Sequence, residues 1–173
     1  MKRLLSLSVA IVLALCAVAA LAEAETEEPV QAELPFDGAW VEFDAGFGMM
    51  LPSDWLVREI TQEQEAVGVF YCATNEDATQ RLILSWADLS AYGAFTEETL
   101  GQQLVSEGYE NVMLLPINGL NFVAYDDTAN DVTALMLLAD EGMSAYYFTF
   151  YPLSDDSFAD TALAIAMSIA LVE

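Results

Sequence analysis

The sequence contains no histidine, only four basic residues and only two cysteines. Without histidine it lacks the commonest general base and the commonest zinc ligand, which excludes ordinary catalytic triads and zinc sites. Its 28 acidic residues give a formal charge of −24, which excludes the usual nucleic-acid binder because such proteins hold phosphates with lysine and arginine. Hydrophobic residues fill 55% of the 173 positions, so the chain is not a disordered acidic protein and has the length of one domain.

Sequence motifs for catalysis are absent as well. There is no G-x-S-x-G nucleophile motif and no Walker sequence, and the Gly-x-Gly pair at 46–48 lacks the third glycine of a dinucleotide fingerprint. Adjacent carboxylates at Glu97-Glu98 and Asp155-Asp156 leave a carboxylate-based hydrolase as an alternative. Acids also favour helix N-termini, so we expect these pairs to stabilise helices. We predict that the chain is not an enzyme.

The N-terminal segment has the layout of a secretory signal peptide. A basic start at residues 1–3 is followed by apolar and small residues at 4–22 and then by acids. Small residues at the exit predict cleavage after Ala22 or Ala24, so we assign 1–22 to the signal peptide. An uncleaved anchor is the alternative, because a stretch of this length is just able to span a bilayer. Cleavage predicts a secreted or extracytoplasmic protein with no stable membrane span.

Residues 23–35 are acidic, contain two prolines and show no apolar period, so we predict a flexible tether before a single α+β domain at 36–173. Loss of the signal peptide would leave Arg58 and Arg81 against all 28 acids, a net charge of −26. Such a charge favours cationic partners, whether metal ions or basic peptides. We expect the two arginines to pair with nearby acids rather than to bind an anionic substrate. Cys72 would remain alone, so no disulfide is expected.

Apolar and alternating runs predict two groups of strands, each followed by a helix, which is an α+β order. Asn118-Gly119 is the clearest hairpin signal, since both residues readily take the positive φ values of a type I′ turn. Thr96 is predicted to cap a helix that ends at Gly108, and a second helix is predicted from about Ser154. The predicted strands are 40–44, 47–51, 67–73, 81–87, 112–117, 120–125, 132–139 and 143–151.

The last two predicted strands are apolar on both faces. Met136 and Leu138 share one face of the first, and Phe148 and Phe150 share one face of the second. An antiparallel sheet with one wet face would instead alternate cleanly between apolar and polar residues. We therefore predict a central antiparallel sheet flanked by helices, with at least three of these four side chains buried.

Several segments together resemble the PsbP/DcrB-like superfamily, whose fold also occurs in a eukaryotic Ran-binding import factor. They are an opening strand with FGMMLPSDW, a middle helix, the hairpin PINGLNFVAY and a terminal helix that closes on IAMSIAL. The resemblance implies an antiparallel sheet flanked by helices for nearly the whole mature chain. These motifs shape turns and helix ends and carry no chemistry. Members of the group do unrelated jobs, so the resemblance implies no function.

A hard cation is the ligand that the sequence favours most. The loop 126–131 places Asp126, Asp127 and Asp131 beside an amide, which is the oxygen-only chemistry that calcium prefers. The loop departs from the EF-hand pattern, and aspartates are also ordinary turn residues. These three aspartates are the calcium candidates, and no other cofactor is predicted.

The predicted function is an exported, non-catalytic binding or accessory domain at the bacterial cell envelope or outside the cell, with a protein or glycan partner. A calcium-responsive structural protein is an alternative, beside the hydrolase. Exposed aromatic residues would point to glycan or peptide binding, but we expect most of them in the core. Cys72 is expected to be buried, the alternative being an exposed, dimer-forming thiol. The aromatic residues considered are Trp40, Trp55, Trp86, Tyr92, Tyr147 and Tyr151.

Overall fold

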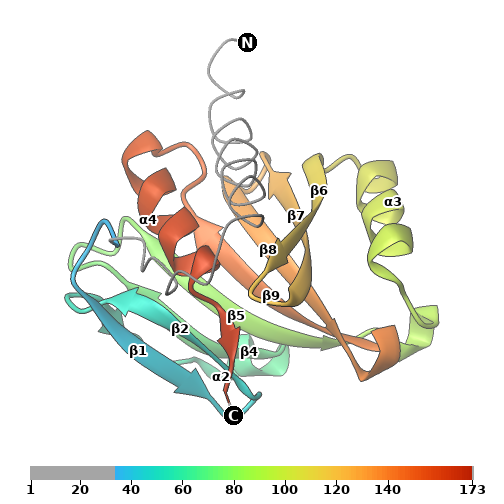
Figure 1. The fold of residues 1–173 in the computed structure, drawn as a ribbon, viewed down its shortest axis with the longest axis horizontal. Helices are drawn as coiled ribbons and strands as arrows, with labels where there is room; N and C mark the ends of the chain where they lie inside the picture. The colour runs from blue at the N-terminus through green and yellow to red at the C-terminus, as the bar shows by residue number, and fades with distance from the viewer. Residues whose placement is uncertain (1–33, 173) are drawn as a thin grey trace, which may run out of the picture. The chain divides into compact units, whose positions relative to one another are not determined.

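Two antiparallel sheets and three α-helices make up residues 34–172, which are the residues that the computed structural model describes (Figure 1). The predicted signal peptide, and the predicted tether as far as residue 33, lie outside the described residues. Contacts group Phe36–Glu173 into one compact unit. No helix within residues 34–172 is long and apolar enough to cross a membrane. The helices are α2 (Gln62–Ala66), α3 (Glu97–Glu107) and α4 (Asp156–Met167).

The larger sheet has seven strands in the order β3-β4-β5-β9-β8-β7-β6. Strand β9 is central, because it pairs with β5 on one side and with β8 on the other. The strands predicted at 81–87, 132–139 and 143–151 are confirmed to within one residue at each end. The bounds are β3 (Leu56–Val57), β4 (Val69–Thr74), β5 (Arg81–Asp88), β6 (Glu110–Ile117), β7 (Leu120–Asp127), β8 (Val132–Ala139) and β9 (Ser144–Tyr151).

A smaller sheet joins the start of the domain to its end. Its order is β1-β2-β10, with β1 (Gly38–Phe43) and β2 (Phe47–Pro52) forming a hairpin and β10 (Ala170–Leu171) pairing with β2. The ring of Phe47 in β2 packs on Phe148 of β9, with 5.1 Å between ring centroids. The smaller sheet therefore packs against one face of the larger sheet (Figure 1).

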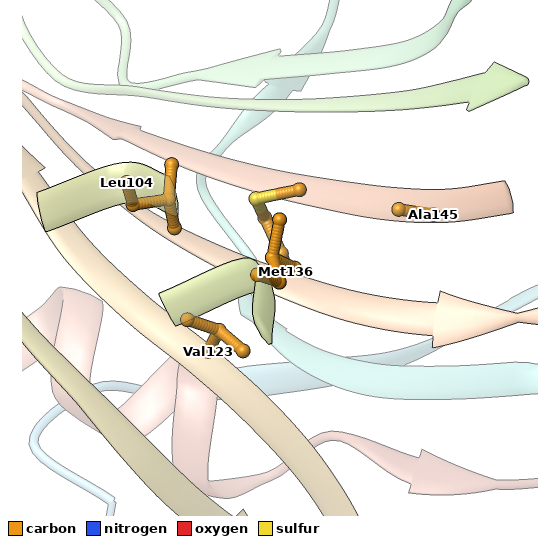
Figure 2. Packing of buried hydrophobic residues seen from close by; sticks show 5 residues of the cluster. Leu104, Val123, Met136 and Ala145 are labelled. Carbon is orange, nitrogen blue, oxygen red and sulfur yellow. The ribbon is translucent and has the colours of Figure 1, made fainter. Parts of the chain in front are cut away.

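The two faces of the larger sheet have different cover. Beside the smaller sheet, α4 packs against β2. On the opposite face α3 packs on β6 and β7, and its Leu100 and Leu104 join Val123, Met136 and Ala145 in one buried cluster (Figure 2). Since successive residues of a strand point to opposite faces, strands between these layers must be apolar on both. The predicted α+β architecture is thus confirmed, and of the four side chains named above three are buried: Met136, Phe148 and Phe150.

Helix α3 begins and ends where the sequence predicted. Thr96 and Thr99 bond reciprocally, each side-chain oxygen accepting from the backbone N–H of the other, and Gly108 closes the helix at a φ of 94°. Helix α4 begins two residues later than the predicted Ser154. The reason is that Asp155 is the cap, its carboxylate accepting a bond from the N–H two residues on.

The turn at Asn118-Gly119 is also confirmed, with φ values of 47° and 82°. The Asn118 side chain has a second role, because its Nδ2 donates to the carbonyls of Met167 at 3.0 Å and Ile169 at 2.8 Å. These carbonyls lie at the end of α4, where the helix has no partners of its own for them. The β6–β7 turn therefore holds the end of the last helix.

Candidate functional site

Aromatic side chains are more exposed than the sequence indicated. None of the six considered above is buried, so the expectation that most lie in the core is wrong. Trp40, Trp86 and Tyr92 are exposed, and the others are half-buried. Phenylalanines fill the core in their place, namely Phe47, Phe122, Phe148, Phe150 and Phe158.

One exposed tryptophan, Trp86, lines an open cleft of about 600 Å³. The cleft lies between the turn that follows β1 and the strands β4, β5 and β9. Its volume is in the range typical of small-ligand sites. We call it the aromatic–acidic cleft, and its lining residues are Glu42, Phe43, Asp44, Ala45, Phe70, Trp86 and Tyr146.

A tight turn forms the rim of the cleft. Gly46 has a φ of 84°, which glycine adopts without strain, and its N–H donates to the carbonyl of Phe43 at 3.0 Å. This turn projects Asp44 and Ala45 from the end of the β1–β2 hairpin. The chain therefore reverses within three residues and leaves an acidic rim.

The opposite wall is positioned by an irregularity in β4. The register with β5 shifts between Val69 and Tyr71, so Phe70 lies in a bulge. Just before it, the carbonyl of Gly68 accepts a bond from the N–H of Trp86 at 2.9 Å. Gly68 has a φ of 87°, and a Cβ there would collide with the carbonyl oxygen of Trp86. Glycine is thus required for the close approach that holds Trp86 at the cleft.

Edge-to-face ring contacts connect the cleft to the core. The ring centroid of Phe70 lies 6.3 Å from that of Phe43, at an interplanar angle of 75°. It lies at the same distance from the ring centroid of Tyr146, at an angle of 87°. Tyr146 in turn meets the buried Phe47 at 5.5 Å. Edge-to-face pairs of this kind fix ring orientation. The aromatic wall is therefore preorganised and exposes 39% of Phe70 and 40% of Trp86.

The charge in the cleft is negative. Glu42 and Asp44 are both exposed, and the lining contains no basic side chain. The indole Nε1 of Trp40 donates to Glu42 Oε1 at 3.1 Å, which orients that carboxylate. Carboxylates and the faces of aromatic rings both attract cations. The arrangement is therefore suited to an ammonium or guanidinium group.

The predicted calcium ligands lie in separate hydrogen-bonded positions. The buried Asp126 accepts bonds from Asn111 Nδ2 at 2.6 Å and from Thr133 Oγ1 at 2.7 Å. Asp127 accepts from the amide of its own turn, and Asp131 accepts from the serine that precedes α4. Within residues 34–172 no three acidic or cysteine side chains gather into a group that could hold a metal. Calcium binding by these residues stays a prediction.

The paired carboxylates occupy helix starts. Glu97 and Glu98 lie in the first turn of α3, and Asp155 caps α4. Side-chain hydrogen bonds from a neighbouring serine or threonine are the main cause that lowers the pKa of Asp77, Asp88 and Asp155. A general acid needs a raised pKa. The pKa of these three carboxyl groups is shifted in the opposite direction.

The two arginines lack the ion pairs that we expected. Arg58 Nε donates to Thr74 Oγ1 at 2.8 Å, and the Arg81 guanidinium lies 5.0 Å from the ring centroid of Tyr151. Neither has a carboxylate within ion-pair distance among residues 34–172, so the expectation is not met there. Cys72 lies on the same strand as Thr74 and is buried, as predicted.

Fold and site together define an α+β domain with a two-sheet core and an open aromatic–acidic cleft. The fold is similar to the solution structure of cyanobacterial PsbP (CyanoP) from Synechocystis sp. PCC 6803. That structure is 12% identical, with a TM-score of 0.56, and the match covers 86% of this chain and 98% of that one. A PsbP-like fold is therefore established, which confirms the resemblance seen in the sequence at the level of the fold.

A second similar structure is a crystal structure from Bacteroides thetaiotaomicron. It is 17% identical, with a TM-score of 0.44, and the match covers 75% of this chain and 46% of that one. No family model matches the chain, and no curated protein matches it significantly.

Of the cleft residues, the sequence drew attention only to Trp86. Three other cleft residues were missed, namely Glu42, Asp44 and Phe70. They lie near Trp86 only because of a hairpin turn and a strand bulge, which the sequence did not predict. For Glu42 and Asp44 the signal is the short segment 40–44, WVEFD, in which two aromatic and two acidic residues lie within five positions.

Proposed function

We propose that this chain is an exported, non-catalytic binding domain whose aromatic–acidic cleft takes a cationic side chain of a partner protein. The observation that carries the proposal is the joint placement of two carboxylates, Glu42 and Asp44, with two exposed rings, Phe70 and Trp86, in one cleft. The strongly negative mature chain adds a long-range field that steers a basic partner toward it.

The contacts available in the cleft favour lysine or arginine over an uncharged group. A cation over an aromatic face contributes about 0.5–2 kcal/mol, depending on how far it is desolvated. The carboxylates at the rim add a charge term that an uncharged ligand cannot use. A glycan would stack on Trp86 without needing Glu42 or Asp44, so it is the competing outcome in the experiments below.

The absence of catalysis in this proposal rests on the acids. The carboxyl groups with a shifted pKa are turn and cap residues whose pKa is lowered, and none of the three lines the cleft. Export rests on the N-terminal sequence, and intact-mass analysis of exported protein should show loss of residues through Ala22 or Ala24. Retention of residues 1–3 would contradict it.

A titration with short peptides tests the cleft directly. Peptides that carry one lysine or arginine should shift the ¹⁵N-indole signal of Trp86, whereas the matched glutamine peptide should not. Trp86→Leu should weaken binding by about two- to 30-fold, the range of one cation–π contact. Tyr92→Leu is the matched control, because Tyr92 is 76% exposed and lies outside the cleft.

The proposal fails if the lysine and glutamine peptides bind equally or if Tyr92→Leu weakens binding as much as Trp86→Leu. If neutral oligosaccharides bind and shift the Trp86 indole signal more than the lysine peptide does, the ligand of the cleft is a glycan and not a cationic side chain.

A further inference from the structure

The only two basic side chains within residues 34–172 lie on the same part of one sheet face. Thr74, Arg81 and Tyr151 are directly paired across β4, β5 and β9. Directly opposed residues of antiparallel strands point to the same face, with Cβ atoms about 4.5–5.5 Å apart. The guanidinium of Arg58 joins this row through its bond to Thr74 Oγ1. Both arginines are half-buried.

This face is opposite to the aromatic–acidic cleft. Trp86 lies five positions after Arg81 on β5, and Tyr146 five before Tyr151 on β9, so each pair points to opposite sides of the sheet. Any ligand of the arginine row is therefore separate from the ligand of the cleft.

The two guanidinium groups have few partners. Arg58 donates to Thr74 Oγ1 and to the carbonyl of Asn75. Arg81 Nε is buried with no hydrogen-bond partner, and the Arg81 guanidinium contacts the ring face of Tyr151. Among 22 acidic residues at positions 34–172, none provides either arginine with an ion pair. Two positive charges thus lie on one sheet face without an ion pair among residues 34–172, although carboxylates are abundant elsewhere on the domain.

Both charges also act on one neighbouring group. Burial is the largest influence on the Cys72 thiol and raises its pKa, while the positive charges of Arg81 and Arg58 each act in the lowering direction. Cys72 pairs with Ile83, one row away on the same face. The positive potentials of the two arginines therefore overlap at this part of the sheet.

We propose that Arg58 and Arg81 form a binding site for a dianionic oxyanion, such as a phosphate group. Arginine presents a planar fork of N–H donors that matches the oxygens of a phosphate, and two such forks balance two negative charges. Bound phosphate supplies the negative charge that no carboxylate among residues 34–172 provides to either arginine. The site does not depend on the proposed function of the cleft.

Inorganic phosphate is the probe, titrated into the purified full chain at constant ionic strength and followed by NMR. We expect saturable shifts of the amide signals of Arg81 and Thr74, with sulfate able to compete and chloride and acetate unable to do so. Arg58→Gln and Arg81→Gln should each weaken phosphate binding by about ten- to 100-fold, the effect of losing a charged hydrogen bond. Arg81→Lys keeps the charge and should still lose several-fold, because the fork is gone.

Two controls make the result decisive. Tyr92→Leu changes an exposed side chain outside the arginine row and should leave phosphate binding unchanged. An amide spectrum of each variant tests whether it is folded. If Arg81→Gln is unfolded, Arg81→Lys takes its place in the comparison. Phosphate shifts that fail to saturate, that persist in both glutamine variants, or that acetate reproduces at equal concentration would overturn the proposal. None of these outcomes bears on the cleft, whose peptide titration is independent.

Discussion

Replacing Phe148 by alanine should remove a buried aromatic contact between the two sheets. Phe148 is fully buried on β9, and its ring meets Phe47 of β2 at 5.1 Å and Phe122 of β7 at 5.6 Å. Deleting a buried phenylalanine ring costs about 3–5 kcal/mol, through lost transfer free energy and the cavity left behind. The two ring pairs place the expected loss near the upper end, because each adds about 0.5–1.5 kcal/mol beyond its buried area. Such a loss is a large fraction of the 5–15 kcal/mol typical of a whole domain.

Urea unfolding followed by circular dichroism measures this loss. Phe148→Leu keeps much of the volume and should cost less than about 1.5 kcal/mol. Phe70→Ala is the matched control, since Phe70 is 39% exposed, and it should cost clearly less than Phe148→Ala. A loss below about 1.5 kcal/mol for Phe148→Ala, or one equal to that of Phe70→Ala, would refute the packing of the smaller sheet on β9.

Three further predictions concern titration and charge. Because burial raises the pKa of the Cys72 thiol, a thiol reagent should label it slowly in the native state and quickly in urea; fast native labelling would show it exposed. Burial likewise raises the pKa of Tyr125 and Tyr147, so stability should hold below about pH 10 and fall above it as these phenols ionise, and Tyr125→Phe should move alkaline unfolding to higher pH. No shift of that midpoint would contradict the role of Tyr125. Calcium should raise the melting temperature no more than magnesium at equal ionic strength, as expected of diffuse screening. A saturable, calcium-selective shift that Asp127→Asn with Asp131→Asn abolishes would instead establish a calcium site.

Local signals predicted much of the fold. Thr96 and Asn118-Gly119 act through hydrogen bonds and φ values set within a few residues, so the sequence is sufficient to place them. The two-faced strands also predicted their own burial, because an apolar side chain on either face requires a layer above it. The pairing of β10 with β2 could not be predicted in this way. A two-residue strand has no periodicity, and its partner lies more than 100 residues away.

The candidate site was harder to predict than the fold. From sequence alone, a tryptophan in an apolar strand is expected in the core. Trp86 lies past the edge of the layer that covers its sheet face and is 40% exposed. Likewise Arg58 and Arg81 were expected to find acids because acids are so numerous. Their actual neighbours are decided by strand register, which places Thr74 and Tyr151 beside Arg81.

The aromatic–acidic cleft as a cation site is the central claim. Isothermal titration of a lysine peptide tests it with two double variants. The cleft variant combines Glu42→Gln and Asp44→Asn. The control variant combines Glu76→Gln and Glu98→Gln, which removes two exposed acids outside the cleft and changes the net charge equally. Removing two exposed charges from the cleft should weaken binding by about fivefold, at about 0.5 kcal/mol for each. The control pair should leave the affinity within about twofold, the long-range field being largely screened in salt. Equal weakening by both pairs, or no weakening by the cleft pair, would contradict the claim.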